Sequence, residues 1–251
     1  MQPHKSEYWL LPKIEDEEKF VTRIEKLNEL YEMVNCPDNE IMISSSDEKT
    51  GIQAISHSQT SKMSVGKLKR IESEYIRNGT TCLIASRNIK TGKLNAYTLG
   101  QTRKEEDFLN HAQEIVATQP NKKHVIICDQ LNTHKSASLV KWVASVCYDT
   151  IDLGIKGKEG ILKSQKSRMC FLENEAHRVR FFYTPKHCSW MNQVENWFGI
   201  LEKKVIKHGE FISVDSLEKQ ISDFICYYNN ILSKPINWTF DAVKYKQKLA
   251  S

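Results

Sequence analysis

Residues 124–129 read His-Val-Ile-Ile-Cys-Asp, and this stretch decides the fold. The apolar run Val125–Cys128 is typical of a strand that is buried on both faces, as strands are in the parallel part of an α/β sheet. Asp129 follows the run directly. Ligands of open α/β sheets gather beyond the carboxyl ends of strands, so Asp129 is a candidate ligand-site residue. An aspartate in this position is also a frequent turn former or helix N-cap, and position alone leaves that alternative open.

Further strands and helices are predicted on both sides of this run. Short apolar or alternating segments predict strands at residues 41–43, 52–55, 81–86, 94–99 and 179–183. Apolar residues at spacings of three and four predict helices at residues 16–34, 104–117, 135–146, 194–207 and 217–231. The turn at Lys90–Lys93 joins two of the strands in a hairpin, and the three early strands are expected to be antiparallel. The pattern is that of an α/β protein.

The composition is that of an ordinary globular chain. The 251 residues are 40% hydrophobic, which is enough for a sizeable core in one large domain or two small ones. No apolar run is long enough to span a bilayer, and the first residues lack the apolar segment of a secretion signal. We therefore expect a cytoplasmic protein without a membrane segment.

Cysteines and charges exclude little by themselves. The seven cysteines are scattered and form no Cys-x-x-Cys pair, so we expect mostly buried thiols and neither disulfides nor a zinc site. The net charge of +5, from 36 basic and 31 acidic residues, permits a polyanionic partner without requiring one. Basic residues concentrate at 155–170, where a solvated face is the common interpretation and DNA contact the less common one.

Two further acidic residues are candidates to join Asp129. Asp47 follows the first predicted strand, and Glu195 lies early in a helix among the large apolar residues Trp190, Met191, Val194, Trp197 and Phe198. A carboxylate in such surroundings is directed to the rim or held by a partner such as a metal, although a solvated helix glutamate is the simpler alternative. Clustered carboxylates suit Mg²⁺ or Mn²⁺, and two such ions can clamp both oxygens of a displacement at phosphorus.

A resemblance to bacterial insertion-sequence transposases of the mariner-related DDE superfamily is carried by four stretches, Ser46–Ala54, Tyr75–Thr81, His124–Lys135 and Phe182–Phe198. The last two are highly specific, and the similarity runs with one interruption from about His4 to near the C-terminus. The resemblance implies a ribonuclease-H-like mixed sheet flanked by helices, in which the first three strands are antiparallel and the later ones parallel. It also implies that the catalytic, metal-binding triad is Asp47, Asp129 and Glu195.

The resemblance further implies how such a protein acts. It implies two Mg²⁺ or Mn²⁺ ions, transposon ends and target DNA as partners, a homodimer as the working unit, and association with the bacterial nucleoid. No small-molecule cofactor is expected. Water attacks a phosphodiester at the transposon end, and the freed 3′ hydroxyl then attacks target DNA, without a covalent intermediate between protein and DNA.

Two departures from the family pattern set the predicted domain organisation. Asp129 and Glu195 are separated by 65 residues, more than is usual in the family, and the excess coincides with an aperiodic segment at about 149–177. We expect an insertion there, and its acids are weaker alternatives to the triad: Asp149, Asp152, Glu159, Glu173 and Glu175. The run Ser44–Ser46 predicts a short or frayed first strand. The predicted division is a linker with an amphipathic helix at 1–37 and a catalytic domain at 38–251.

The start of the chain leaves other functions open. Relatives begin with helix-turn-helix modules, whereas this chain starts at what resembles the linker that follows them. One hypothesis is an inactive, truncated transposase remnant that acts only as a DNA-binding or regulatory protein, and another is one product of a split or frameshifted gene. A nuclease of the same fold would share the triad without performing strand transfer.

Candidate DNA contacts lie beside the presumed triad in sequence: His134, Lys135, Lys186, His187, Trp190 and Asn192. Cationic side chains hold phosphates and aromatic rings stack on exposed bases, which is why these residue types are candidates. Each also has a structural alternative. Trp190 is equally well explained as a packing residue, and Asn192 as a helix cap.

Overall fold

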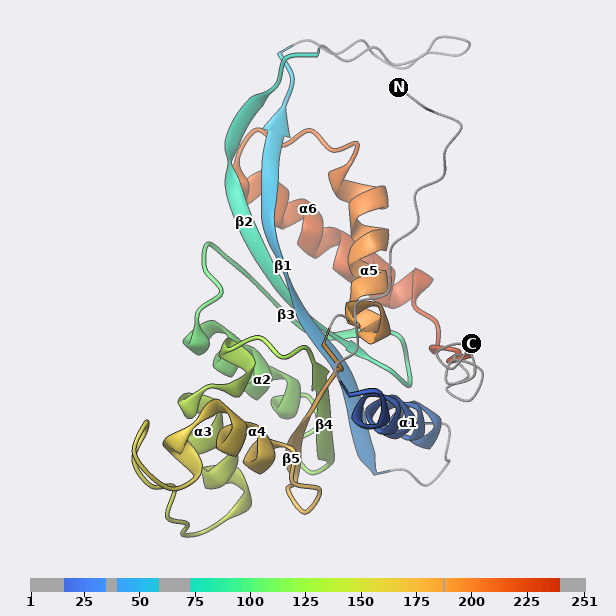
Figure 1. Ribbon diagram of the computed structural model, residues 1–251. Coiled ribbons are helices and arrows are strands. Elements are labelled where there is room, and N and C mark those ends of the chain that lie inside the picture. Colours follow the sequence, from blue (N-terminus) through green and yellow to red (C-terminus); the bar gives the residue numbers. More distant parts are fainter. Residues whose placement is uncertain (1–15, 35–39, 59–72, 187, 240–251) are drawn as a thin grey trace.

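One five-stranded sheet organises the computed structural model, which describes residues 16–34, 40–58, 73–186 and 188–239 (Figure 1). The strands are β1 (Ile41–Ser56), β2 (Ile76–Asn88), β3 (Leu94–Gly100), β4 (Lys123–Cys128) and β5 (Val179–Tyr183). Their order across the sheet is β3-β2-β1-β4-β5. β1, β2 and β3 pair antiparallel, whereas β4 runs parallel to both β1 and β5. The predicted mixed sheet is therefore confirmed.

Helices cover both faces of the sheet. On one face α2 (Glu105–Ala117), α3 (Ala137–Cys147) and α4 (Gln165–Leu172) share a core with apolar residues of all strands except β1. On the other face α1 (Glu17–Met33) packs over β1 and β4, while α5 (Gln193–Leu201) and α6 (Val214–Tyr227) pack over the antiparallel strands (Figure 1). The short helical turns are η1 (Thr133–Lys135), η2 (Ile161–Lys163), η3 (Ser189–Met191), η4 (Glu202–Ile206) and η5 (Tyr228–Leu232).

The first strand is neither short nor frayed, which corrects the expectation from the serine run. β1 continues without a break from Ile41 to Ser56 and merges the two strands predicted at 41–43 and 52–55. Ser44, Ser45 and Ser46 are 1%, 0% and 0% exposed. Polar residues can lie inside a sheet when hydrogen bonds satisfy them, and Ser44 and Ser45 have such partners.

Ser45 is the polar contact that joins the sheet to α5. Its hydroxyl accepts a hydrogen bond of 2.8 Å from the backbone N–H of Val194, in the first turn of the helix. The same hydroxyl donates to the side-chain oxygen of Asn192, the residue that precedes the helix. Asn192 makes no side-chain cap of its own, so Ser45 satisfies a helix N-terminal N–H from outside the helix.

The segment 149–177 packs against the helices that cover one face of the sheet. It forms η2 and α4, and Leu162, Phe171 and Leu172 enter the core shared with α3 and β5. Glu173, at the end of α4, forms an ion pair with Arg23 of α1. Arg23 also donates a 2.7 Å hydrogen bond to the Tyr183 carbonyl at the end of β5. The predicted boundaries at 37 and 149–177 remain predictions, because packing of this kind does not mark a domain limit.

The described cysteines are free thiols, as expected, but they are not mostly buried. Only Cys128 and Cys188 are buried, whereas Cys82 and Cys147 are intermediate and Cys170 and Cys226 are exposed. Cys36 lies outside the described residues. Within the described ranges, no helix is both long enough and apolar enough to cross a membrane.

The contact between Ser45 and α5 predicts that substitution of Ser45 destabilises the protein more than substitution of the neighbouring Ser46. In Ser45→Ala, the buried N–H of Val194 and the side-chain oxygen of Asn192 lose their partner, which should cost about 1–3 kcal/mol. The melting temperature in thermal unfolding should fall by several degrees. Ser46→Ala is the matched control, because the buried Ser46 hydroxyl has no hydrogen-bond partner. Equal destabilisation by both changes would contradict the assignment.

Candidate metal centre

The register of the parallel strands brings Asp47 and Asp129 side by side. The last pairs between β1 and β4 are Ser44 with Ile126 and Ser45 with Ile127. Two residues further on, the same register sets Asp47 opposite Asp129, on chains that lie about 4.8 Å apart. Asp47 is 7% exposed, because β1 continues past this point under α5, whereas the Asp129 side chain is 41% exposed where β4 has ended.

Glu195 reaches the same place from α5. The N-terminal end of this helix is fixed from several elements: Tyr31 of α1 donates to the Met191 carbonyl at 2.9 Å, and Arg87 of β2 donates to the Gln193 carbonyl at 3.3 Å. With the Ser45 contact, these bonds hold the first turn of α5 against β1. Glu195 lies in that turn and is half-buried. The structure thus brings together all three residues of the predicted triad.

Electrostatic coupling shows how closely the three carboxyls lie. Burial raises the pKa of Asp47 to about 7, and the charges of Asp129 and Glu195 add to the effect. Burial also raises the pKa of Glu195, against a hydrogen bond from Asp47 that lowers it. Burial would likewise raise the pKa of Asp129, but the hydrogen bond and charge of His134 outweigh it and hold this pKa below its ordinary value. The three acids therefore lack enough neighbouring positive charge to balance their own negative charge.

Each aspartate is oriented by specific donors. Asp47 accepts hydrogen bonds from the Glu48 N–H at 2.8 Å and from the side-chain amide of Asn192 at 3.0 Å. Asp129 accepts from the Leu131 N–H at 2.9 Å and from His134 Nδ1 at 2.8 Å, both through Oδ1. Their rotamers are therefore set before any ligand arrives, as a positioned binding group requires.

The predicted DNA contacts separate into buried and exposed residues. His134 is fully buried and Asn192 is 0% exposed, so neither offers DNA a surface in this fold. Both instead hydrogen-bond to the aspartates. Lys135 is 7% exposed, Lys186 is exposed and Trp190 is 43% exposed, whereas His187 lies outside the described residues.

Several residues of this centre carry no sequence signal by themselves. In the sequence, Ser45, Glu48 and Arg87 look like ordinary strand residues. In the structure, Ser45 holds Asn192, Glu48 holds His134, and Arg87 holds the start of α5. The adjacent pair Asp47-Glu48 is the one available hint, since successive strand residues point to opposite faces of a sheet. Of the alternative acids in the segment 149–177, Glu173 pairs with Arg23, and Glu175 pairs with Arg180 at 3.4 Å.

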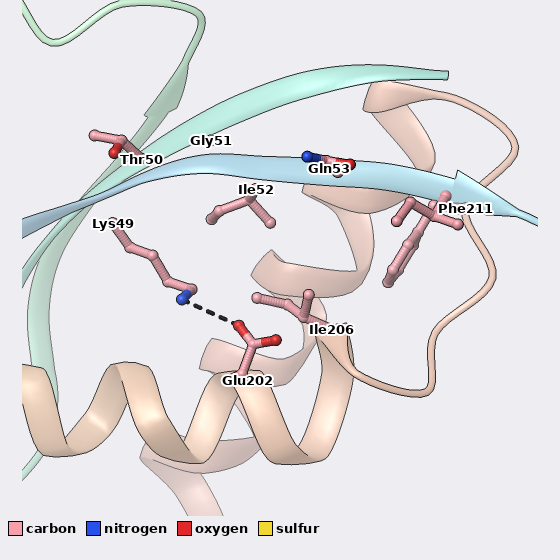
Figure 2. Close-up of a pocket in the computed structure, with 9 residues that line it drawn as sticks. Lys49, Thr50, Gly51, Ile52, Gln53, Glu202, Ile206 and Phe211 are labelled. Atoms are coloured by element: carbon pink, nitrogen blue, oxygen red, sulfur yellow. Dashed lines mark ion pairs between the residues drawn. The ribbon is translucent and has the colours of Figure 1, made fainter. Parts of the chain in front are cut away.

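A hollow of about 230 Å³ lies farther along β1, next to the centre (Figure 2). Ile52, Ile55, Ile206 and Phe211 give it apolar walls, and Lys49 forms a 3.0 Å ion pair with Glu202 at one side. None of the three carboxylates lines this hollow. A partly exposed ion pair of this kind contributes at most about 1 kcal/mol. The chemistry of the centre therefore lies outside the hollow, at the half-open end of β4.

The donor set of the centre fits a divalent cation. Burial, with the charges of Asp129 and Glu195, raises the pKa of Asp47, so a cation would stabilise its ionised form, and hard oxygen ligands suit Mg²⁺ or Mn²⁺. Among the described residues, no three side chains already stand close enough to form a finished metal site.

Comparisons with known proteins identify the family and the fold. Residues 43–218 match the family described as DDE superfamily endonuclease, and residues 195–248 match the integrase core domain. The catalytic domain of Mos1 mariner transposase has a TM-score of 0.50 at 9% identity, over 96% of this chain and 91% of that chain. The Mos1 paired-end complex with Mn gives 0.37 at 13% identity, over 92% and 68%. The likeness to the catalytic domain confirms the ribonuclease-H-like fold. No curated protein sequence matches the chain.

The raised pKa of Asp47 predicts a pH-dependent stability in metal-free buffer. Between the ordinary pKa of 3.8 and the folded value of about 7, the folded protein holds a proton that the unfolded chain releases. This stabilisation is full below about pH 4 and is lost as pH rises to about 7, at about 1.4 kcal/mol for each pH unit. Asp47→Asn removes the titration, so relative to the wild type its melting temperature should rise by several degrees from pH 5 to pH 8.

Thermal unfolding of both proteins at the two pH values measures the effect. Asp152→Asn, at an exposed aspartate, is the matched control. A difference between the wild type and Asp47→Asn that is the same at pH 5 and pH 8 would show that Asp47 has no raised pKa.

Proposed function

The chain belongs to the DDE superfamily endonuclease family, and on that premise we propose that it is the catalytic domain of a DNA transposase. In this proposal Asp47, Asp129 and Glu195 hold two Mg²⁺ or Mn²⁺ ions. The DNA substrate is the end of an insertion sequence, the acceptor is target DNA, and the working unit is a homodimer in the bacterial cytoplasm. Mos1 complexes with DNA ends and with Mn or Mg supply the analogy for the partner and the metal.

One observation carries the proposal. Three carboxylates, from β1, from the end of β4 and from the first turn of α5, come together at one partly exposed site. Burial raises the pKa of Asp47 and of Glu195, and repulsion by the neighbouring carboxylates adds to the effect. Buried charges of one sign persist in proteins when a bound cation or a functional role compensates them. If the three acids had only a structural role, nothing would offset the repulsion between their charges.

The reaction proceeds by two exchanges of one P–O bond for another. Water first attacks a phosphodiester at the transposon end and releases a 3′ hydroxyl, and that hydroxyl then attacks a phosphodiester of target DNA. Bound divalent cations supply activation of the attacking oxygen and neutralise charge on the leaving oxygen. The side chains contribute position: Asn192 orients Asp47, His134 orients Asp129, and Ser45 and Arg87 hold the helix that carries Glu195.

A basic loop lies beside the centre and suits the DNA backbone. Arg168 donates a 2.8 Å hydrogen bond to the carbonyl of Lys135, which ties the segment 149–177 to the turn that follows Asp129. Burial acts to raise the pKa of Glu105, but hydrogen bonds from Ser138 and the charges of Lys156 and Arg168 lower it. The loop therefore reaches the start of α2, and its exposed lysines are Lys156, Lys158, Lys163 and Lys166.

The test of catalysis is metal-dependent cleavage of labelled DNA that carries the sequences flanking the gene. In Mg²⁺ or Mn²⁺ the wild type should cleave, and Asp129→Ala and Glu195→Ala should each lose at least ~100-fold. Changes behind metal ligands already cost about 10- to 100-fold, and a ligand should cost at least as much. Joined products on supercoiled target DNA distinguish a transposase from a nuclease of the same fold.

The matched control is Glu175→Gln, at an exposed acid of the segment 149–177 that lies outside the centre. It should cleave as the wild type does. Cleavage that survives both Asp129→Ala and Glu195→Ala would refute the triad. Absence of both cleavage and metal binding would support an inactive regulatory remnant.

The basic loop predicts a change in the salt dependence of DNA binding. Each phosphate contact adds about −0.9 to the slope of log K against log salt concentration. Lys156→Gln with Lys158→Gln should therefore make the slope less steep by up to about 2. Fluorescence anisotropy with a labelled duplex at several salt concentrations measures it.

A second pair of exposed lysines gives the matched control, with the same loss of charge. Lys122 and Lys123 lie at the opposite end of β4, about 20 Å from Asp129 along the strand. Lys122→Gln with Lys123→Gln should leave the slope unchanged. Equal effects of the two pairs would show that DNA binding does not use the loop in particular.

A further inference from the structure

Glu48 is a buried acid next to the centre that the proposed reaction does not use. It follows Asp47 in β1, and its side chain points to the opposite face of the sheet, toward η1. The Glu48 side chain is 2% exposed and contacts His134 Nε2 at 3.0 Å. A carboxylate so deeply buried requires a charged or hydrogen-bonding partner, and the imidazole of His134 provides it.

His134 of η1 is held by contacts from α2 and β5. Its side chain is 0% exposed and its ring packs on Phe108 with centroids 4.0 Å apart. The Tyr183 hydroxyl of β5 donates a 2.7 Å hydrogen bond to the His134 carbonyl, so the backbone of η1 is fixed as well. An imidazole packed in this way does not turn to serve another ligand.

The two ring nitrogens of His134 have different carboxylates as partners. Nε2 faces Glu48 at 3.0 Å, and Nδ1 faces Asp129 Oδ1 at 2.8 Å. Carboxylate oxygens only accept hydrogen bonds, so the ring must donate from both nitrogens. A ring that donates twice has no lone pair left for a metal or for a substrate proton. It can act only through the groups that it holds.

Resting on the proposed function, we propose that Glu48 and His134 are a pair of positioning residues that fix Asp129 for metal binding. Glu48 anchors the imidazole from the buried face of β1, and the imidazole holds Oδ1 of Asp129. The Leu131 N–H also uses Oδ1, so within the described part of the chain Oδ2 keeps its lone pairs for a cation. Such outer partners of metal ligands typically change metal affinity by about 10- to 100-fold.

The partial exposure of Asp129 distinguishes positioning from mere core stability. Its side chain is 41% exposed, and an aspartate at the surface needs no buried ion pair in order to be solvated. Glu48 and His134, whose side chains are buried, thus restrain Asp129. Water alone could satisfy the hydrogen bonds of the Asp129 carboxylate. The restraint is useful if Asp129 must present one oxygen in a fixed direction.

Mn²⁺ binding by calorimetry and thermal unfolding, both on the full chain, test the proposal. The double variant Glu48→Leu with His134→Phe replaces the buried pair by apolar groups of similar size, which can leave stability nearly unchanged. We expect it to melt within a few degrees of the wild type and to bind Mn²⁺ at least ~10-fold more weakly. Glu48→Gln keeps an oxygen acceptor for Nε2–H, and it should rescue binding to within about threefold of the wild type.

The contrary results are equally definite. A folded double variant that binds Mn²⁺ as the wild type does would overturn the proposal. If the double variant does not fold, Glu48→Ala decides: binding at least ~3-fold weaker than that of Glu48→Gln supports positioning, and equal binding overturns it. Asp129→Asn separates the two proposals, because Mn²⁺ binding that this variant leaves intact refutes the metal centre itself.

Discussion

The parallel pairing of β1 with β4 is the constraint on which the rest of the structure depends. Its register ends at Ser45 with Ile127, and two residues further on the same register sets Asp47 opposite Asp129. A slip of one residue would turn Asp47 toward the opposite face of the sheet, away from α5. The apolar run of β4 is buried under helices on both faces, with Ile126 and Cys128 in one core and Val125 and Ile127 in the other.

Polar contacts then convert this register into a site. Ser45 and Asn192 attach the start of α5 to β1, and Arg87 and Tyr31 hold the same turn from other elements. Glu195 is thereby brought to the two aspartates from a part of the chain that is separated from Asp129 by 65 residues. The burial of these donors and acceptors makes each contact costly to lose, so the acidic centre is coupled to the stability of the fold.

The segment 149–177 packs on the other face of the sheet and also contacts the surroundings of the acidic centre. Its helix α4 adds to the core over β5, and Arg23 and Arg168 tie it to α1 and to the turn after Asp129. An aperiodic sequence concealed this packing, because α4 has only eight residues and its stability comes from tertiary contacts. The additional residues between Asp129 and Glu195 therefore do not prevent these two acids from lying in one site.

The sequence by itself determined the mixed sheet, the buried run of β4, most helices and the motifs around Asp47, Asp129 and Glu195. Periodicity and specific local patterns are properties of neighbouring residues, and they survive without knowledge of the fold. Only the tertiary structure decided that the serines of β1 are buried, that Asn192 bonds to Asp47, and that His134 lies between Glu48 and Asp129. The contacts of Asn192 with Asp47 and of His134 with Glu48 join residues 145 and 86 positions apart, and local sequence does not encode such pairings.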